Sequence, residues 1–244
     1  MRLLLFNPNT TAALTQRLAA SASCVLPSDV DLVPVTAGSG FPYISSRAEA
    51  QIAGAGVLEG LAERAGTFDA AVIAAFGDPG LQAARELFDL PVTGMSEAAM
   101  IMSLSLGERF AFVTFSRRMR PWYDEQVTRA GLATRFAGTF TPDEGFGSIS
   151  SVAEEMREPL LRTCLCAAEA ADVLVLAGAP IAGLANDIAG DVPAILVDPV
   201  QAAVVHAVAL HRLRPQGADR GSYARPPGKA SAGLPAAIAT RLAR

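Results

Sequence analysis

Short runs rich in β-branched residues alternate with Ala-, Leu- and Glu-rich stretches along nearly the whole chain. Consecutive parallel strands need a crossover between them, usually a helix, so this alternation is typical of a parallel sheet covered by helices. The sequence therefore predicts an α/β fold. Strands are expected at residues 3–6, 31–35, 70–75, 92–94, 110–114, 134–138, 173–176 and 194–197.

Polar residues stand where several of the intervening helices should begin. A side-chain oxygen just before a helix can accept a hydrogen bond from one of its first, otherwise unpaired N–H groups. The last of these capped helices is expected to be long and to run through residues 156–171. The expected caps are Thr10 or Thr11, Ser46, Asp78 and one of the serines at 148–151.

Two kinds of segment recur at nearly one offset. The segment from Val72 reads VIAAFGDPG and is echoed by VLAGAP, which places Ala75 opposite Gly178, 103 residues later. The segment from Pro91 reads PVTGMSEAAM and is echoed 102 residues later by PAILVDPVQAA. A weaker third echo pairs LFNPN, from Leu5, with FVTFS. This repetition predicts two similar α/β lobes whose strands end in loops of Gly, Pro, Asn, Asp and Ser.

The repeat divides the chain into three parts. Residues 1–100 should form the first lobe, completed by a helix at 200–213, and residues 101–199 the second. Residues 214–244 begin with a segment rich in Pro, Gly and Arg and are expected to be an extended tail. The tail is either mobile or packed on a neighbouring subunit, and we expect a homo-oligomer.

Composition excludes several classes of protein. The chain is 51% hydrophobic, yet its most apolar stretch, 173–185, is broken by Gly and Pro and is shorter than the roughly 20 residues of a membrane span. A net charge of −4 leaves no basic stripe for nucleic acid. Three cysteines without CxxC spacing predict reduced, packed thiols and no metal site. No secretory signal precedes Asn7, so a cytoplasmic protein with a small-molecule partner is expected.

Two facing α/β lobes should share one cleft. In open α/β sheets, ligands bind outside the carboxyl ends of the strands, where loops and helix N-termini present backbone N–H groups. A small anionic molecule is the expected ligand. The cleft walls should come from residues 7–10, 76–80, 95–97, 114–116, 178–180 and 197–198.

Six segments carry a resemblance to a known family. They are NPNT from Asn7, FGDPGL from Phe76, GMSEAAM from Gly94, VT from Val113, AGLA from Ala182 and DPV from Asp198. Over residues 1–213 the chain resembles the aspartate/glutamate/hydantoin racemase superfamily, within it the hydantoin and allantoin racemase branch. This resemblance implies two pseudo-symmetric flavodoxin-like lobes, a substrate between them, and a reaction without cofactor or metal. It also implies two cysteines, one per lobe, that exchange the proton on the substrate's stereogenic carbon.

The chain departs from this pattern at both cysteines. The matching positions hold Ala75 and Gly178, and neither side chain can transfer a proton. Three interpretations remain open. The chain is a racemase-like isomerase that uses a non-thiol variant of the chemistry on a small carboxylate or cyclic imide, a binding protein without catalysis, or a lyase, decarboxylase or hydrolase on the same scaffold.

Three carboxylates near the expected cleft are candidate replacements for the thiols. Glu97, Asp78 and Asp198 each stand in a predicted strand-to-helix loop. A buried carboxylate with a raised pKa can act as a general base, whereas one at the start of a helix can equally well be a cap.

A second set of residues is expected to bind substrate. Hydroxyl and amide groups do not ionise near neutral pH, so they suit holding a carboxylate or imide better than proton transfer. Tyr43 and Tyr123 line the entrance or pack within loops. The expected substrate-binding residues are Asn9, Thr10, Ser45, Phe76, Thr114, Ser116 and Ala179.

Overall fold

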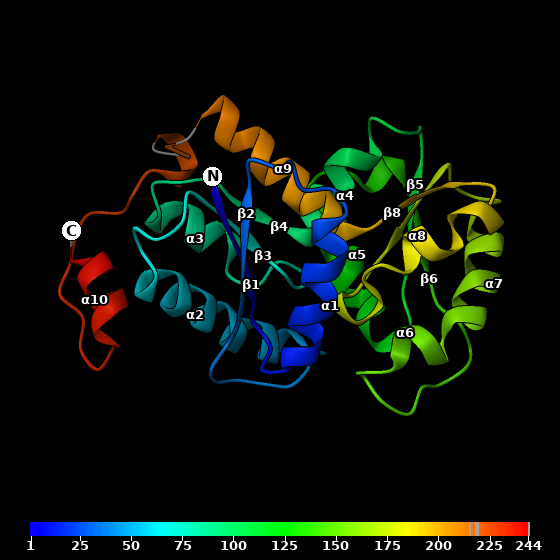
Figure 1. Cartoon of the computed structure of the whole chain (residues 1–244), viewed down its shortest axis with the longest axis horizontal. Coiled ribbons are helices and arrows are strands. Elements are labelled where there is room, and N and C mark those ends of the chain that lie inside the picture. Colours follow the sequence, from blue (N-terminus) through cyan, green and yellow to red (C-terminus); the bar gives the residue numbers. More distant parts are fainter. Residues whose placement is uncertain (215, 218–219, 244) are drawn as a thin grey trace.

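The protein contains two four-stranded parallel sheets, seen in a computed structural model that describes residues 1–214, 216–217 and 220–243 (Figure 1). The first sheet has the order β2-β1-β3-β4 and the second β6-β5-β7-β8, so the second repeats the topology of the first. This confirms the predicted α/β fold of two lobes. The strands are β1 (Arg2–Asn7), β2 (Asp31–Thr36), β3 (Ala70–Ile73), β4 (Val92–Gly94), β5 (Phe110–Val113), β6 (Phe136–Phe140), β7 (Val173–Leu176) and β8 (Ile195–Val197).

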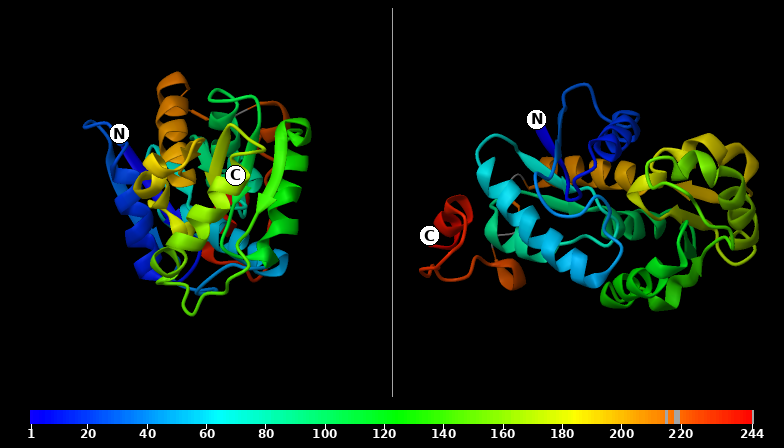
Figure 2. Two further views of the ribbon diagram at one scale, coloured as in Figure 1. Left: turned by 90° about the vertical axis from the view of Figure 1, so that its right-hand side faces the viewer. Right: turned by 90° about the horizontal axis from the view of Figure 1, so that it is seen from below.

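Helices connect these strands and flank the two sheets, which lie side by side along the long axis of the molecule (Figure 2). The α-helices are α1 (Ala12–Ser23), α2 (Arg47–Glu63), α3 (Leu81–Leu87), α4 (Met95–Ser103), α5 (Arg120–Arg129), α6 (Val152–Glu155), α7 (Arg157–Ala167), α8 (Leu184–Ile188), α9 (Pro199–Leu213) and α10 (Ala236–Leu242). The short 3₁₀ helices are η1 (Arg117–Met119), η2 (Ala133–Arg135), η3 (Ala179–Ile181), η4 (Ala189–Asp191) and η5 (Gly221–Tyr223).

The central strands are hydrophobic throughout because helices cover both of their faces. All four residues of β3, of β5 and of β7 are buried, as expected for strands in the middle of a parallel sheet. One apolar cluster contains Leu3 and Val72 of the first sheet together with Phe112 and Val175 of the second. The two lobes are therefore joined by a common core.

Helix α9 follows the last strand of the second sheet but returns to the first lobe. It packs against α4, β3 and β4 (Figure 1). The Thr93 hydroxyl on β4 donates a hydrogen bond of 3.0 Å to the carbonyl of Ala203 on α9. The first lobe is thus built from both ends of the chain.

The described part of the C-terminal segment contacts the first lobe of its own chain. Arg225 donates hydrogen bonds to the carbonyl of Leu87 (2.9 Å) and to Asp89 (2.7 Å). Helix α10 lies against α2, with Ile238 buried and the Arg241 guanidinium 4.8 Å from the centre of the Phe88 ring. Positions 215, 218, 219 and 244 of the predicted tail lie outside the described residues.

Several sequence-based boundaries and caps need correction. Ser46 caps α2 as predicted, by accepting from the Glu49 N–H. Thr11 precedes α1 without a side-chain cap, because its hydroxyl instead donates to the Pro42 carbonyl at 2.8 Å. Asp78 does not cap α3, whose preceding residue is Gly80.

The predicted long helix is in fact two helices, α6 and α7. None of the serines that precede it forms a side-chain cap. It breaks at Met156 because Pro159 has no N–H to offer the Glu155 carbonyl. Strand β6 begins two residues later than the predicted range 134–138.

The cysteines do not all pack in the core. Cys164 is buried on α7, as predicted, whereas Cys24 and Cys166 are exposed. Residues two apart on a helix point to different faces, so burial of Cys164 leaves Cys166 outside.

Candidate active site

A small cavity lies between the lobes, beyond the carboxyl ends of β1, β3 and β7. Its volume is about 20 Å³, the space of a single water molecule. Its wall includes Asn9 after β1, Ala75 and Phe76 after β3, and Ala179 after β7. The remaining wall residues are Tyr43, Ile44, Tyr123 and Pro180.

Aromatic side chains account for the small size of this cavity. Phe76 packs edge-on against Tyr123, with ring centres 4.7 Å apart, and against Phe112 at 5.1 Å. Tyr43 contacts Phe115 at 6.0 Å. The rings fill most of the space at the carboxyl ends of the sheets and leave only a small cavity.

The two tyrosines are the ionisable residues of this wall, and burial keeps them protonated. Burial raises the pKa of Tyr43, with Glu49 adding to the effect, and burial also raises the pKa of Tyr123, with Tyr43 adding to it. Within the described residues, the Tyr43 hydroxyl and the buried Thr114 hydroxyl have no hydrogen-bond partner. The Tyr43 hydroxyl, which lies in the wall, is therefore available to a ligand in this cavity.

Ala75 and Gly178, the positions opposite each other in the repeat, have different surroundings. Ala75 lies in the cavity wall. Gly178 has a φ of 137°, which L-residues rarely adopt, and a Cβ there would lie 2.9 Å from Cε1 of Phe115. The Phe115 ring itself packs against Phe146 at 5.2 Å. A side chain at position 178 would thus require both a change of backbone and a displaced phenyl ring.

Asp78 is buried and holds the start of α4. Its carboxylate accepts from the N–H groups of Ser96 (2.9 Å) and Glu97 (2.8 Å). Burial raises the pKa of Asp78 to about 6, against the lowering effect of these two hydrogen bonds. With a φ of 51°, Asp78 is the described non-glycine residue in the left-handed region, and its side chain occupies the space that a Cβ at Gly94 would need. The loop after β3 is therefore tied to α4.

Asp198 performs a similar task in the second lobe. One oxygen accepts from the Val200 N–H at the start of α9 (2.9 Å), and the other accepts from the Gly183 N–H (2.6 Å) and from the Ser21 hydroxyl (2.9 Å). Burial raises the pKa of Asp198, with these donors acting in the opposite direction. Asp198 thus connects α9, the start of α8 and α1.

Glu97 is engaged outside the cavity. Both of its oxygens accept from the Arg85 guanidinium, at 2.6 and 3.0 Å, which joins α4 to α3. None of the three candidate carboxylates belongs to the cavity wall among the described residues.

The predicted binding residues divide into two groups. Asn9, Phe76 and Ala179 line the cavity. Ser45 instead bonds to Glu49 at 3.0 Å, and the predicted residues Thr10, Thr114 and Ser116 are outside the wall. Ile44 was missed because nothing in the sequence distinguishes it from an ordinary apolar loop residue.

A second, more polar groove separates the lobes on the outer side of the loop after β3. It encloses about 500 Å³ between α2, α3 and α5, and an ion pair between Arg47 and Glu125 crosses it. Trp122 of α5 packs on Gly77, where it fills the space of a missing side chain. The loop 77–80 is therefore held between the cavity on one side and this groove on the other.

The described residues contain no group of three or more His, Cys, Asp or Glu placed to hold a metal ion. No described helix is both long enough and apolar enough to cross a bilayer.

The repeated parallel sheets and the cavity at their carboxyl ends define a two-lobed α/β protein with an interlobe site. A family model described as Asp/Glu/Hydantoin racemase matches residues 3–207. The chain belongs to the Asp/Glu/hydantoin racemase family, as its resemblance to that superfamily predicted.

Two kinds of comparison place the chain among its relatives. It is 33% identical over 230 residues to a hydantoin racemase of Paenarthrobacter aurescens, covering 93% of this chain and 98% of that one. It also superposes on the allantoin racemase from Klebsiella pneumoniae with a TM-score of 0.88 and 28% identity, covering 98% of each chain. An arylmalonate decarboxylase structure, at 17% identity and a TM-score of 0.58 over 91% of this chain and 97% of that one, shares the fold.

Proposed function

We propose that this chain is an isomerase of its family that acts on a hydantoin-like cyclic imide bound between the lobes. The observation that carries the proposal is the uncharged character of the cavity wall. Among the described residues, the wall offers the Asn9 amide, two neutral phenols and backbone groups, without a lysine, arginine or carboxylate. A neutral imide presents carbonyl oxygens and N–H groups that can pair with such a wall, whereas a buried carboxylate would call for a compensating charge or several donors.

Substrate entry requires the lobes or the 37–46 loop to open. A substituted five-membered ring is much larger than one water molecule, and the cavity has a volume of about 20 Å³. Tyr43 belongs to the loop between β2 and α2, so its displacement would enlarge the site without disturbing either sheet. Closing over the substrate would then exclude water from the reacting carbon.

The proposed reaction is proton exchange at the acidic carbon of the ring without thiols and without a cofactor. The resemblance places the two thiols of the usual route at Ala75 and Gly178, where neither residue can act. The protonated hydroxyls of Tyr43 and Tyr123 suit two other tasks. One donates to the oxygen on which negative charge develops when the carbon loses its proton to the base, and the other returns a proton to the opposite face of that carbon, which inverts it. The phenolate formed in this way recovers the proton held by the base through solvent.

Asp78 is the proposed general base. It stands two residues after Phe76, on the side of the loop that borders the polar groove between α2, α3 and α5, and its pKa of about 6 is close to the value that favours proton transfer near neutral pH. To reach the substrate it must release the two N–H groups of α4. Glu97 and Asp198 act as positioning residues, because their oxygens are engaged by Arg85 and by the start of α9.

Loss of the α-proton signal in deuterated buffer, followed by proton NMR, tests this proposal. The panel contains 5-substituted hydantoins and allantoin, compared with aspartate, glutamate and substituted malonates. We expect catalysed exchange with the cyclic imides alone, and at least a hundredfold slower exchange with Asp78→Asn. Asp124→Asn, a carboxylate change on α5, serves as the control. Exchange that is equal in Asp78→Asn and the wild type would remove Asp78 from the mechanism.

A second candidate function is ligand binding without turnover. It is favoured by the closed second-lobe wall at Gly178 and by the full engagement of all three carboxylates in hydrogen bonds. A bound ligand raises the melting temperature in either case, so only exchange separates the two functions. Stabilisation by a hydantoin without any proton exchange would establish the binding function.

A further inference from the structure

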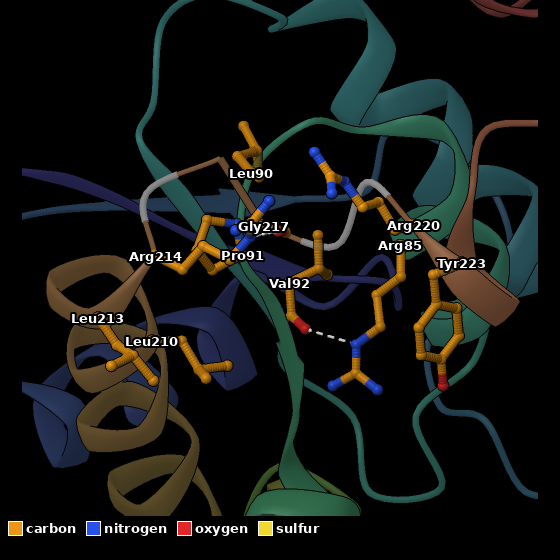
Figure 3. Close-up of a pocket in the computed structure, with 10 residues that line it drawn as sticks. All are labelled: Arg85, Leu90, Pro91, Val92, Leu210, Leu213, Arg214, Gly217, Arg220 and Tyr223. Atoms are coloured by element: carbon orange, nitrogen blue, oxygen red, sulfur yellow. Dashed lines mark hydrogen bonds between the residues drawn. The ribbon is translucent and has the colours of Figure 1, made fainter.

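A larger cavity lies at the other end of the first lobe, where β4 begins and α9 ends (Figure 3). It encloses about 600 Å³, within the range of roughly 300–1,000 Å³ that small-molecule sites occupy. The interlobe cavity lies beyond the carboxyl ends of the strands, whereas this one borders Val92, the first residue of β4. The two cavities are therefore separate sites.

One part of the wall is apolar. Leu90, Pro91 and Val92 come from the approach to β4, and Leu210 and Leu213 from the last turn of α9 (Figure 3). Leu213 is 82% exposed, which is an unusually large fraction for a leucine. An apolar group bound here would remove this leucine from water.

The other part of the wall is cationic. Arg85, Arg214 and Arg220 reach it from α3, the end of α9 and the C-terminal segment (Figure 3). Arg85 is fixed in place, because its Nε donates to the Val92 carbonyl at 3.0 Å and its guanidinium lies 5.5 Å from the centre of the Tyr223 ring. A positive group is thus held against the apolar surface.

The balance of charge indicates the charge of the ligand. Arg85 is already paired with Glu97. Arg214 and Arg220 bring two further guanidinium groups to the wall, and the described wall residues include no carboxylate. The wall therefore favours an anionic ligand.

We propose that this cavity binds a small monocarboxylate with an apolar body, such as an aryl- or alkyl-substituted carboxylic acid. The carboxylate pairs with the arginine side of the wall, and the apolar body covers Leu210 and Leu213. This proposal does not depend on the reaction between the lobes. It applies whether the interlobe cavity catalyses a reaction or only binds a ligand.

Isothermal titration of the full chain with 4-phenylbutanoate tests this proposal. The matched probes are 4-phenylbutan-1-ol, which lacks the charge, and acetate, which lacks the apolar body. We expect the acid to bind at least tenfold more tightly than either probe, and more weakly as salt is added. Equal binding of the acid and the alcohol would overturn the proposal.

Two variants locate the binding site. Arg220→Gln should weaken 4-phenylbutanoate binding about fivefold to tenfold, because it removes one of the wall's charges. Arg109→Gln makes the same change of charge on an exposed arginine of the second lobe and should leave the affinity unchanged. Equal affinities of the two variants, or displacement of the acid by a hydantoin, would place the ligand elsewhere and refute the site.

Discussion

Both lobes use a buried carboxylate to make the same connection, but the carboxylate comes from a different segment in each lobe. In each lobe a buried aspartate ties the loop beyond the third strand to the helix after the fourth strand. In the first lobe the carboxylate comes from the loop, since Asp78 accepts from two N–H groups of α4. In the second it comes from the helix start, since Asp198 precedes α9 and accepts from Gly183. The two lobes therefore share their topology and the connection between loop and helix. The position of the aspartate that forms this connection differs between them.

The same comparison applies at the cavity wall. Ala75 has a backbone conformation that any residue can adopt. Gly178 has a positive φ, and a side chain at this position would collide with Phe115. The first lobe could carry a thiol at this position with little rearrangement, and the second could not. The second lobe has thus moved further from the two-cysteine arrangement that the resemblance implies.

Placing a cysteine in each lobe gives the largest expected difference. Gly178→Cys should lower the free energy of unfolding by about 4 kcal/mol, because backbone strain and the collision with Phe115 add together. Ala75→Cys should cost less than about 1 kcal/mol, since a free thiol behaves as a small apolar group. Urea unfolding measures both. Similar costs at the two positions would show that the second lobe is as permissive as the first.

The pH dependence of stability sharpens the comparison of the aspartates. The pKa of Asp78 is raised to about 6 in the folded chain from 3.8, so the folded state retains a proton that the unfolded state releases. As pH rises from about 4 to about 6, Asp78 should lower the free energy of unfolding by on the order of 3 kcal/mol.

Asp78→Asn removes this contribution, so the difference between variant and wild type should change with pH in that window. Exposed glutamates whose pKa is lowered by arginine partners, such as Glu125, act in the opposite direction in both proteins and cancel in the comparison. A pH-independent difference between the two stability curves would show that Asp78 is not buried as a carboxylate with a raised pKa.

Two substitutions of Asp198 distinguish its two roles, which are to cap α9 and to accept from the Gly183 N–H. Asp198→Ala should cost about 2 kcal/mol, because the start of α9 and the Gly183 N–H both lose their acceptor. Asp198→Ser should recover about half of this, since a serine can cap the helix but has no second oxygen for Gly183. Denaturant melts of the two variants measure the split. Equal stability of the serine and alanine variants would contradict a role in capping.

Removing the C-terminal segment has the smallest expected effect. A chain ending at Leu213 loses the burial of Ile238 and the contacts of Arg225, which should lower the free energy of unfolding by about 1 kcal/mol after the ordering cost of the segment is subtracted. Thermal unfolding measures this change, and gel filtration of the same chain reports on the expected homo-oligomer. Dissociation of an oligomer on truncation would show that the segment also contacts a neighbouring subunit.

Features that depend on local sequence could be predicted, and features that depend on distant contacts could not. The strand positions and the echo of the segment from Val72 by VLAGAP led to two parallel sheets. Ser46 could be recognised as a cap because its partner Glu49 is three residues away. The partners of Asp78 lie 18 and 19 residues away, on α4, and α3 and β4 stand between Asp78 and that helix in the chain. Local sequence therefore assigned it to the wrong helix.

The state of the cavity could not be predicted for the same reason. The loops that form the wall were identified, and Asn9, Phe76 and Ala179 were placed in it. The small size of the cavity depends on Tyr43 and Tyr123, which come from different lobes and meet only in the folded chain. The obstruction at Gly178 likewise depends on a phenyl ring 63 residues earlier in the sequence.

The return of α9 to the first lobe sets the order in which the chain can be completed during synthesis. Strands β5 to β8 span residues 110–197 without interruption, so the second sheet can assemble as soon as that stretch has left the ribosome. The first lobe is begun earlier but leaves β3, β4 and α4 uncovered until residues 199–213 emerge. The half of the protein that is translated first is therefore the half that is finished last, and its apolar surface is the one that nascent-chain chaperones would need to shield.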